Sequence, residues 1–169
     1  MRAAWAIMAI AVALALQTTL ARFVIRGTVA IDLVLVVVVY LALTSGPVTG
    51  LLSGTLAGLI QDALSSGIIG IGGLAKTVVG FLAGIIGTQF IVTQPLPRFV
   101  VFFGATVVHA VVFIGLYVLL DLRQFNTPVP AVTSQAVGNA VVGVIAFQVV
   151  EFLPGAVERR RAGKNWTRR

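Results

Sequence analysis

The sequence predicts an all-α integral membrane protein whose six transmembrane helices form one compact bundle. Hydrophobic residues make up 59% of the 169 residues, charged residues make up 10%, and the mean hydropathy is +1.07. A soluble domain has a smaller apolar share. The apolar residues fall into six runs, and most of these are long enough to cross a bilayer core of about 30 Å. Lipid is therefore the expected solvent for most of the chain.

Short connections separate the six expected spans. The segments "TSGP", "SSG", "TQPLPR" and "DLRQFNTPVP" are rich in residues that favour turns. Because the runs follow one another so closely, we expect one transmembrane domain over residues 1–155 and a basic tail over residues 156–169. The second run is short and crosses only if it tilts or the bilayer thins around it. The expected spans cover about residues 3–21, 29–43, 47–65, 68–92, 99–120 and 131–153.

The basic residues predict the orientation of the spans. The net charge is +7, and six of the twelve Lys and Arg residues lie after residue 158. This clustering is typical of a cytoplasmic tail, and we expect no nucleic-acid partner. With six crossings the N-terminus is also cytoplasmic, so that Arg2 and Arg98 lie inside while Arg22, Arg26 and Arg123 lie outside. In the alternative reading the first run is a cleaved signal peptide, which leaves five spans, but its length favours a retained helix.

Regularly spaced glycines mark the third and fourth spans. In "GPVTGLLSGTLAG" the glycines recur at every fourth position and share one helix face. Small residues let helix backbones approach closely in lipid, where no hydrophobic force draws apolar helices together. We expect the two spans to form a tight antiparallel hairpin, and the glycine face is also a candidate surface for a partner helix. Alternatively, glycine is simply common in membrane helices. The residues concerned are Gly50, Gly54 and Gly58 in the third span and Gly80, Gly84 and Gly87 in the fourth.

Three ionisable side chains lie within the second, third and fourth spans. Such groups are costly in a membrane and suggest a function by default. Asp32 falls near the outer end of its span, where Arg26 could pair with it among the headgroups. Asp62 and Lys76 lie about 7 Å and about 12 Å from the outer turn at 1.5 Å per residue. We expect these two to pair and fix the hairpin, with a proton or ion pathway as the alternative.

The remaining polar residues of the spans favour hydrogen bonds between helices. His109 lies in the middle of "VVHAVV" with no activating neighbour in sequence, so we expect a neutral imidazole bonded to another helix, with a proton relay as the alternative. Gln135 and Asn139 are four residues apart on the sixth span, and Gln17 and Gln148 lie near the ends of theirs. Amide side chains of this kind link membrane helices.

No catalytic pattern fits the sequence well. Asp32 and Asp62 suggest an intramembrane aspartyl protease, whose carboxylates share a proton at close range. However, Asp32 is predicted to lie near the surface, and Gln61 stands where that class has glycine. The serines have only His109 as a base, and the sequence contains no cysteine, phosphate loop or HExxH motif. We therefore expect no enzymatic activity, no cofactor and no metal, and keep an intramembrane hydrolase as a third hypothesis.

The motifs of the second to fourth spans resemble those of the MreD family of rod shape-determining proteins. "IDLVLVVVVYLAL" supplies the Asp-Leu pair of that family at Asp32 and Leu33. "GLLSGTLAGLIQDALSSGIIGIGGLAKTVVGFLAG" supplies the Gly-Leu-x-x-Asp element at Gly58, Leu59 and Asp62, then a small-residue turn and a glycine-containing span. The family usually has proline before the first aspartate, whereas this chain has isoleucine.

The resemblance implies a non-enzymatic subunit of the bacterial cell-elongation machinery in the cytoplasmic membrane. Proteins of this family bind the single-pass scaffold MreC and act with the filament protein MreB, the glycan polymerase RodA and its transpeptidase partner. Their fold is similar to the substrate-binding subunits of energy-coupling-factor vitamin transporters. A subunit of such a transporter is accordingly the alternative function.

The tail "VERRRAGKNWTRR" has two readings. In the first, its basic residues only hold the end of the last span in the cytoplasm; in the second, which we favour, they bind anionic lipid headgroups, at about 1 kcal/mol per basic residue near the surface. Trp166 is suited to the membrane interface. No motif in the tail specifies contact with a cytoplasmic filament.

Overall fold

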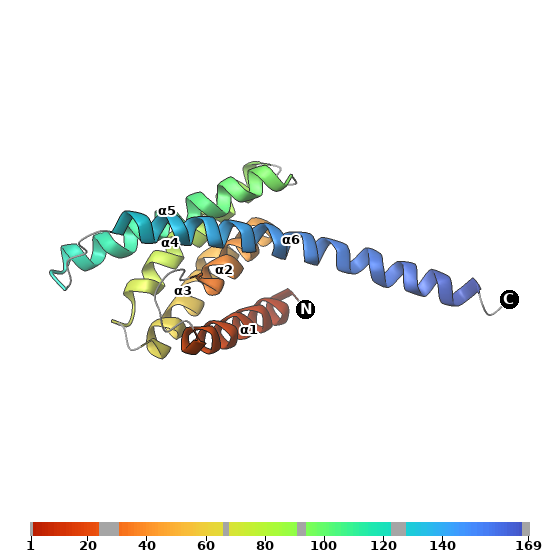
Figure 1. Ribbon diagram of the computed structural model, residues 1–169, viewed down its shortest axis with the longest axis horizontal. Coiled ribbons are helices and arrows are strands. Elements are labelled where there is room, and N and C mark those ends of the chain that lie inside the picture. Colours follow the sequence, from red (N-terminus) through yellow and green to blue (C-terminus); the bar gives the residue numbers. More distant parts are fainter. Residues whose placement is uncertain (1, 24–30, 66–67, 91–93, 123–127, 167–169) are drawn as a thin grey trace.

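The described residues of the computed structural model form six α-helices (Figure 1). The structure describes residues 2–23, 31–65, 68–90, 94–122 and 128–166. Each helix falls on one of the six apolar runs, because turn-forming residues interrupt the runs in between. The helices are α1 (Arg2–Phe23), α2 (Leu33–Ser45), α3 (Pro47–Leu64), α4 (Ile71–Gln89), α5 (Pro95–Leu119) and α6 (Pro128–Trp166).

Three of the helical segments are long and apolar enough to cross a membrane. They are Ile71–Gln89, Pro95–Leu119 and Val129–Phe152. Two further apolar helical segments, Ala4–Thr19 and Leu33–Ser45, are shorter. The last helix does not end near residue 153, where we expected the span to end, but continues to Trp166 and extends away from the other helices (Figure 1).

Helix α2 lies at the centre of the fold. It contacts each of the other five helices, and seven of its residues are buried. A helix that is apolar on every face requires such a position, which accounts for the run of valines in its sequence. At 13 residues it is about 20 Å long, and its N-cap residue, Asp32, is itself buried.

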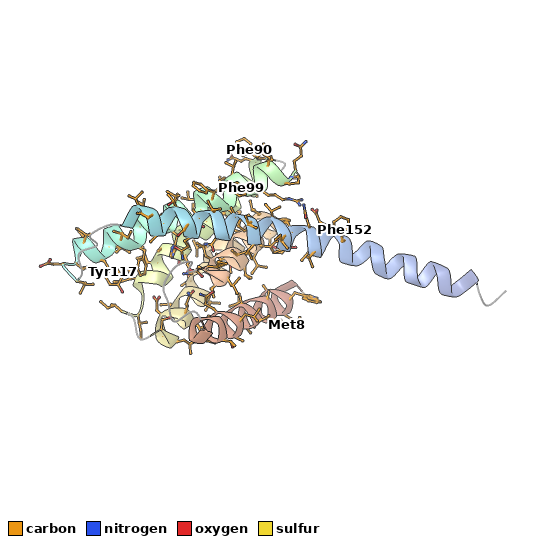
Figure 2. The ribbon with its side chains drawn as sticks, viewed as in Figure 1. Met8, Phe90, Phe99, Tyr117 and Phe152 are labelled. Carbon is orange, nitrogen blue, oxygen red and sulfur yellow. The ribbon has the colours of Figure 1, made fainter. Side chains whose placement is uncertain are left out.

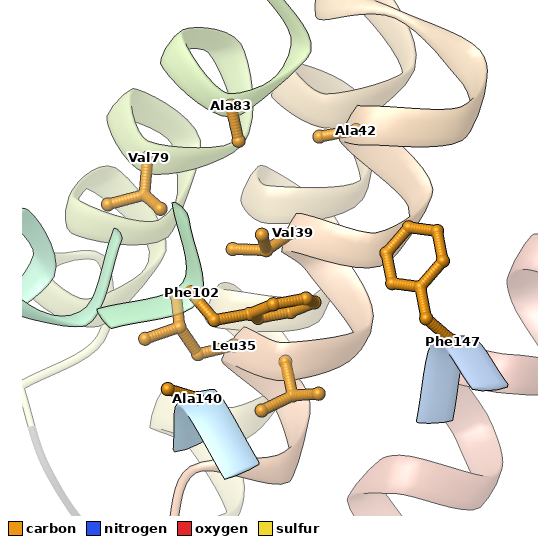
Figure 3. Packing of buried hydrophobic residues seen from close by; sticks show 9 residues of the cluster. Leu35, Val39, Ala42, Val79, Ala83, Phe102, Ala140 and Phe147 are labelled. Carbon is orange, nitrogen blue, oxygen red and sulfur yellow. The ribbon is translucent and has the colours of Figure 1, made fainter. Parts of the chain in front are cut away.

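The largest buried cluster joins α2 to α4, α5 and α6 (Figure 3). Leu35 and Val39 of α2 lie beside Phe102 of α5, and the ring of Phe102 meets that of Phe147 edge-on at a centroid distance of 6.1 Å. Ala140 of α6 belongs to the same buried cluster. The interlocking of small and aromatic side chains gives the close packing that holds helices together in lipid.

The glycines of α3 face α4 within the same chain. A Cβ atom added to Gly50 would overlap the backbone of Gly80, and one added to Gly54 would overlap the carbonyl of Lys76. Gly58 is in similar contact with Gly73. The close approach of α3 and α4 therefore uses this face, and the candidate surface for a separate partner helix must lie elsewhere.

The fourth-span glycines also pack against the junction of α2 and α3. Gly84 lies against Pro47, and Gly87 lies against the backbone of Leu43. At the junction itself Gly46 has φ of 90°, a conformation that favours glycine, and Pro47 starts α3. The chain can thus reverse within one residue between two helices.

Candidate functional site

A buried ion pair joins α4 to the start of α2. The Nζ atom of Lys76 lies 2.8 Å from Oδ2 of Asp32, and the two residues are 3% and 5% exposed. Asp32 also caps α2, because its Oδ1 accepts a hydrogen bond of 2.9 Å from the backbone N–H of Leu35. One carboxylate thus stabilises both a helix start and a buried ammonium group.

This pairing corrects two sequence-based predictions. Asp32 was expected at the outer surface beside Arg26, but it is buried, and Arg26 lies outside the described residues. Lys76 was expected to pair with Asp62, but its partner is Asp32. The physical reason is that Gly54 of α3 packs on the backbone carbonyl of Lys76, so α3 occupies the backbone side of that residue. The lysine side chain extends to α2 instead.

His109 of α5 is the second partner of Lys76. Its Nε2 atom lies 3.2 Å from the lysine Nζ. A lysine ammonium group has donors only, so Nε2 accepts in this contact and the imidazole carries its proton on Nδ1. This agrees with the neutral, helix-linking histidine that the sequence suggested. Asp32, Lys76 and His109, from three different helices, form what we call the buried triad.

Asn139 of α6 connects the triad to the rest of the core. Its Oδ1 accepts a hydrogen bond of 2.9 Å from the backbone N–H of Asp32, and its Nδ2 donates to Oγ1 of Thr106 at 3.1 Å. Gln17 of α1 acts similarly: its Oε1 accepts from the N–H of Leu33, and its Nε2 donates to the carbonyl of Ile31. Two amide side chains thus satisfy backbone groups that a buried helix start would leave unpaired.

Asp62 has a separate structural role at the start of α4. Its Oδ2 accepts hydrogen bonds from the backbone N–H groups of Gly70 and Gly73, at 2.9 and 3.0 Å. A Cβ atom on Gly72 would overlap the Asp62 carboxylate, so the close approach requires glycine there. A carboxylate at a helix N-terminus interacts favourably with the helix dipole.

A second ion pair was missed in the sequence. Arg98 at the start of α5 is 3% exposed and makes a two-bond contact with Glu151 of α6, in which Nη1 donates to Oε2 at 2.9 Å. The guanidinium carbon also lies 4.4 Å from the ring centre of Phe147. We had counted Arg98 as a loop charge, because nothing local in the sequence shows that α6 passes over it.

The triad forms one side of a cavity of about 350 Å³. Besides the triad, polar groups from α3 and α6 line it, namely Gln61, Asp62, Ser65 and Gln135. Tyr117 of α5 also lines it, and Figure 2 shows this residue at the opposite end of α5 from Phe99. The cavity therefore lies at the end of the bundle away from the Arg98 pair.

The buried charged side chains form ion pairs and cap helix starts. Asp32 and Asp62 bind different partners, one a lysine and the other backbone N–H groups, whereas an aspartyl protease pair shares one proton. Within the described part of the chain, no cluster of three or more His, Asp or Glu residues is arranged to hold a metal ion. Charged groups that compensate each other in the interior mainly hold helices in register.

The apolar helices and the buried triad identify this chain as a helical membrane protein with a polar centre. Residues 1–154 match the family model described as rod shape-determining protein MreD. The chain therefore belongs to the MreD family, and family membership gives it a role in rod-shape determination. Searches of curated proteins and of solved structures gave no match.

Proposed function

We propose that this protein is a non-enzymatic membrane subunit of the bacterial cell-elongation complex, where it binds the scaffold MreC and supports lateral peptidoglycan synthesis. MreB, RodA and the transpeptidase partner of RodA belong to the same larger complex. The family match over residues 1–154 is the observation that carries this proposal. The paired state of the buried charges supports it, since these groups hold helices together.

The proposal includes the arrangement in the membrane. All six helices cross or enter the bacterial cytoplasmic membrane, with both termini in the cytoplasm and the fold of an energy-coupling-factor substrate-binding subunit. The positive charge of the tail supports this orientation. In it, the cavity beside the buried triad opens outward and the Arg98–Glu151 pair lies towards the cytoplasm.

Co-purification tests the proposed complex. The full chain is tagged at its N-terminus, extracted in mild detergent and captured, and the recovered chains are identified by mass spectrometry. We expect MreC, and enrichment of RodA and MreB at lower yield. A tagged membrane protein of similar size serves as the control. Recovery of the intact protein without MreC from cells that express both would refute the proposal.

The cavity favours a second candidate function, the substrate-binding subunit of an energy-coupling-factor vitamin transporter. Its volume of about 350 Å³ is within the range of small-molecule sites. The same capture experiment separates the two functions, because a transporter subunit would bring down a pair of ATPases and a membrane coupling protein instead of MreC.

A further inference from the structure

The cavity beside the buried triad has an aromatic wall. His109, Phe113 and Tyr117 are spaced four residues apart on α5 and all line the cavity. The His109 and Phe113 rings are stacked with centroids 5.8 Å apart, and the Phe113 and Tyr117 rings are 4.8 Å apart. Residues at this spacing share one helix face, so the three rings line the cavity together. Such a surface favours a flat aromatic ligand.

The part of the lining that α3 supplies offers hydrogen-bond acceptors. Among the described residues, Oε1 of Gln61 is a buried side-chain atom that has no hydrogen-bond partner. Leaving a buried acceptor unpaired is costly, so an atom of this kind points to a missing donor. The Asp62 carboxylate accepts its two hydrogen bonds through Oδ2, and a carboxylate has further lone pairs to offer.

The charges of the described lining residues favour a cationic ligand over an anionic one. Asp32 and Asp62 are acidic and Lys76 is basic, which leaves one negative charge in excess when His109 is neutral. The ammonium group of Lys76 already contacts Asp32 and His109. Among the described lining residues, a ligand anion would therefore meet a carboxylate and no free cation, whereas a cation would also be attracted to the ring faces.

We propose that this cavity binds a small planar aromatic molecule that carries N–H donors and no negative charge. The rings of α5 stack on the ligand, and Gln61 and Asp62 accept its N–H groups. This site goes beyond the structural role proposed above, and ligand binding and recovery of MreC are measured in different experiments. Loss of ligand binding and loss of MreC are therefore separate results.

Benzamidine is the probe that tests the site, because it joins a flat ring to an N–H-rich cation. Binding to the full chain in detergent is followed by saturation-transfer NMR, with empty micelles as the blank. We expect saturable binding of benzamidine and none of benzoate, its anionic counterpart. No saturable signal at millimolar benzamidine, or equal binding of benzoate, would overturn the proposal.

Matched variants locate the binding. We expect Phe113→Leu and Gln61→Leu each to lower the affinity for benzamidine by at least about threefold. Phe90→Leu and Gln148→Leu make the same changes at exposed positions outside the cavity and should leave the affinity unchanged. If Phe113→Leu does not fold, Tyr117→Leu replaces it. Equal affinity in the cavity and control variants would refute this location.

Discussion

The Nζ atom of Lys76 lies 2.8 Å from Oδ2 of Asp32, so that a residue in the second turn of α4 is bound to the N-cap residue of α2. The pair crosses the centre of the fold and is almost fully buried. Neither charge can be removed without leaving the other uncompensated in a medium of low polarity. The arrangement gives a direct test of what the buried triad does.

Single replacements in this pair should destabilise the protein strongly. Asp32→Asn and Lys76→Met each leave one buried charge, which costs about 3–5 kcal/mol. The double variant removes both charges and should recover much of the loss. Thermal unfolding in detergent measures all three, and a double-mutant cycle gives the coupling. Single variants with the same midpoint as the parent protein would show that the pair has no structural role.

The glycine face of α3 should be sensitive to even one methyl group. Gly54→Ala places a Cβ atom on the backbone of Lys76, and overpacking of this kind costs about 1–3 kcal/mol. Gly104→Ala is the matched control in α5, since no atom lies within 4 Å of its added Cβ. The yield of folded protein and its unfolding midpoint are compared. Equal behaviour of the two variants would contradict the close packing of α3 on α4.

Asp62 should stabilise the start of α4 without being needed for membrane insertion. Removing an N-terminal cap costs about 0.5–2 kcal/mol, so we expect Asp62→Ala to lower the unfolding midpoint. Asp62→Asn keeps a side-chain oxygen that accepts and should have a smaller effect. Hydrogen exchange at the amides of Gly70 and Gly73 should be slowest in the parent protein, faster in Asp62→Asn and fastest in Asp62→Ala. Unchanged exchange at both amides in the alanine variant would refute the capping role.

The two partners of the second ion pair should respond unequally. Arg98 is buried and also lies against the Phe147 ring, whereas the Glu151 side chain is 56% exposed. Glu151→Gln should therefore lower the unfolding midpoint more than Arg98→Met, because it leaves the buried guanidinium without its carboxylate partner, whereas Arg98→Met leaves a carboxylate that water solvates. Arg98→Lys should not restore the parent value, because lysine cannot make the two parallel bonds of a guanidinium group. A larger effect of Arg98→Met than of Glu151→Gln would contradict this assignment.

The absence of cysteine permits a clean test of topology. Ser65→Cys and Leu122→Cys lie at the cavity end of the bundle, and Gln94→Cys lies before the start of α5. In intact spheroplasts, a membrane-impermeant maleimide should label the first two and reach Gln94→Cys only after lysis. Labelling of all three before lysis, with a cytoplasmic marker protected, would rule out the proposed orientation.

The sequence by itself determined the class, the positions of the helices and the family. These depend on local properties: hydropathy sets which segments leave water, Gly and Pro interrupt helices, and the short Asp-Leu and Gly-Leu-x-x-Asp motifs carry the resemblance. The match over residues 1–154 confirms the family. The crossing of all six spans stays a prediction, since three of the described helical segments are long and apolar enough.

Only the tertiary structure decided which polar groups meet. The partner of Lys76 depends on the depth at which α2 begins and on the rotation of α4, and both are set by packing among several helices. The same is true of Arg98, whose partner lies 53 residues further along the chain. Spacing along one helix shows which residues share a face, but it does not show which neighbour that face contacts. The cavity and its aromatic wall result from that arrangement.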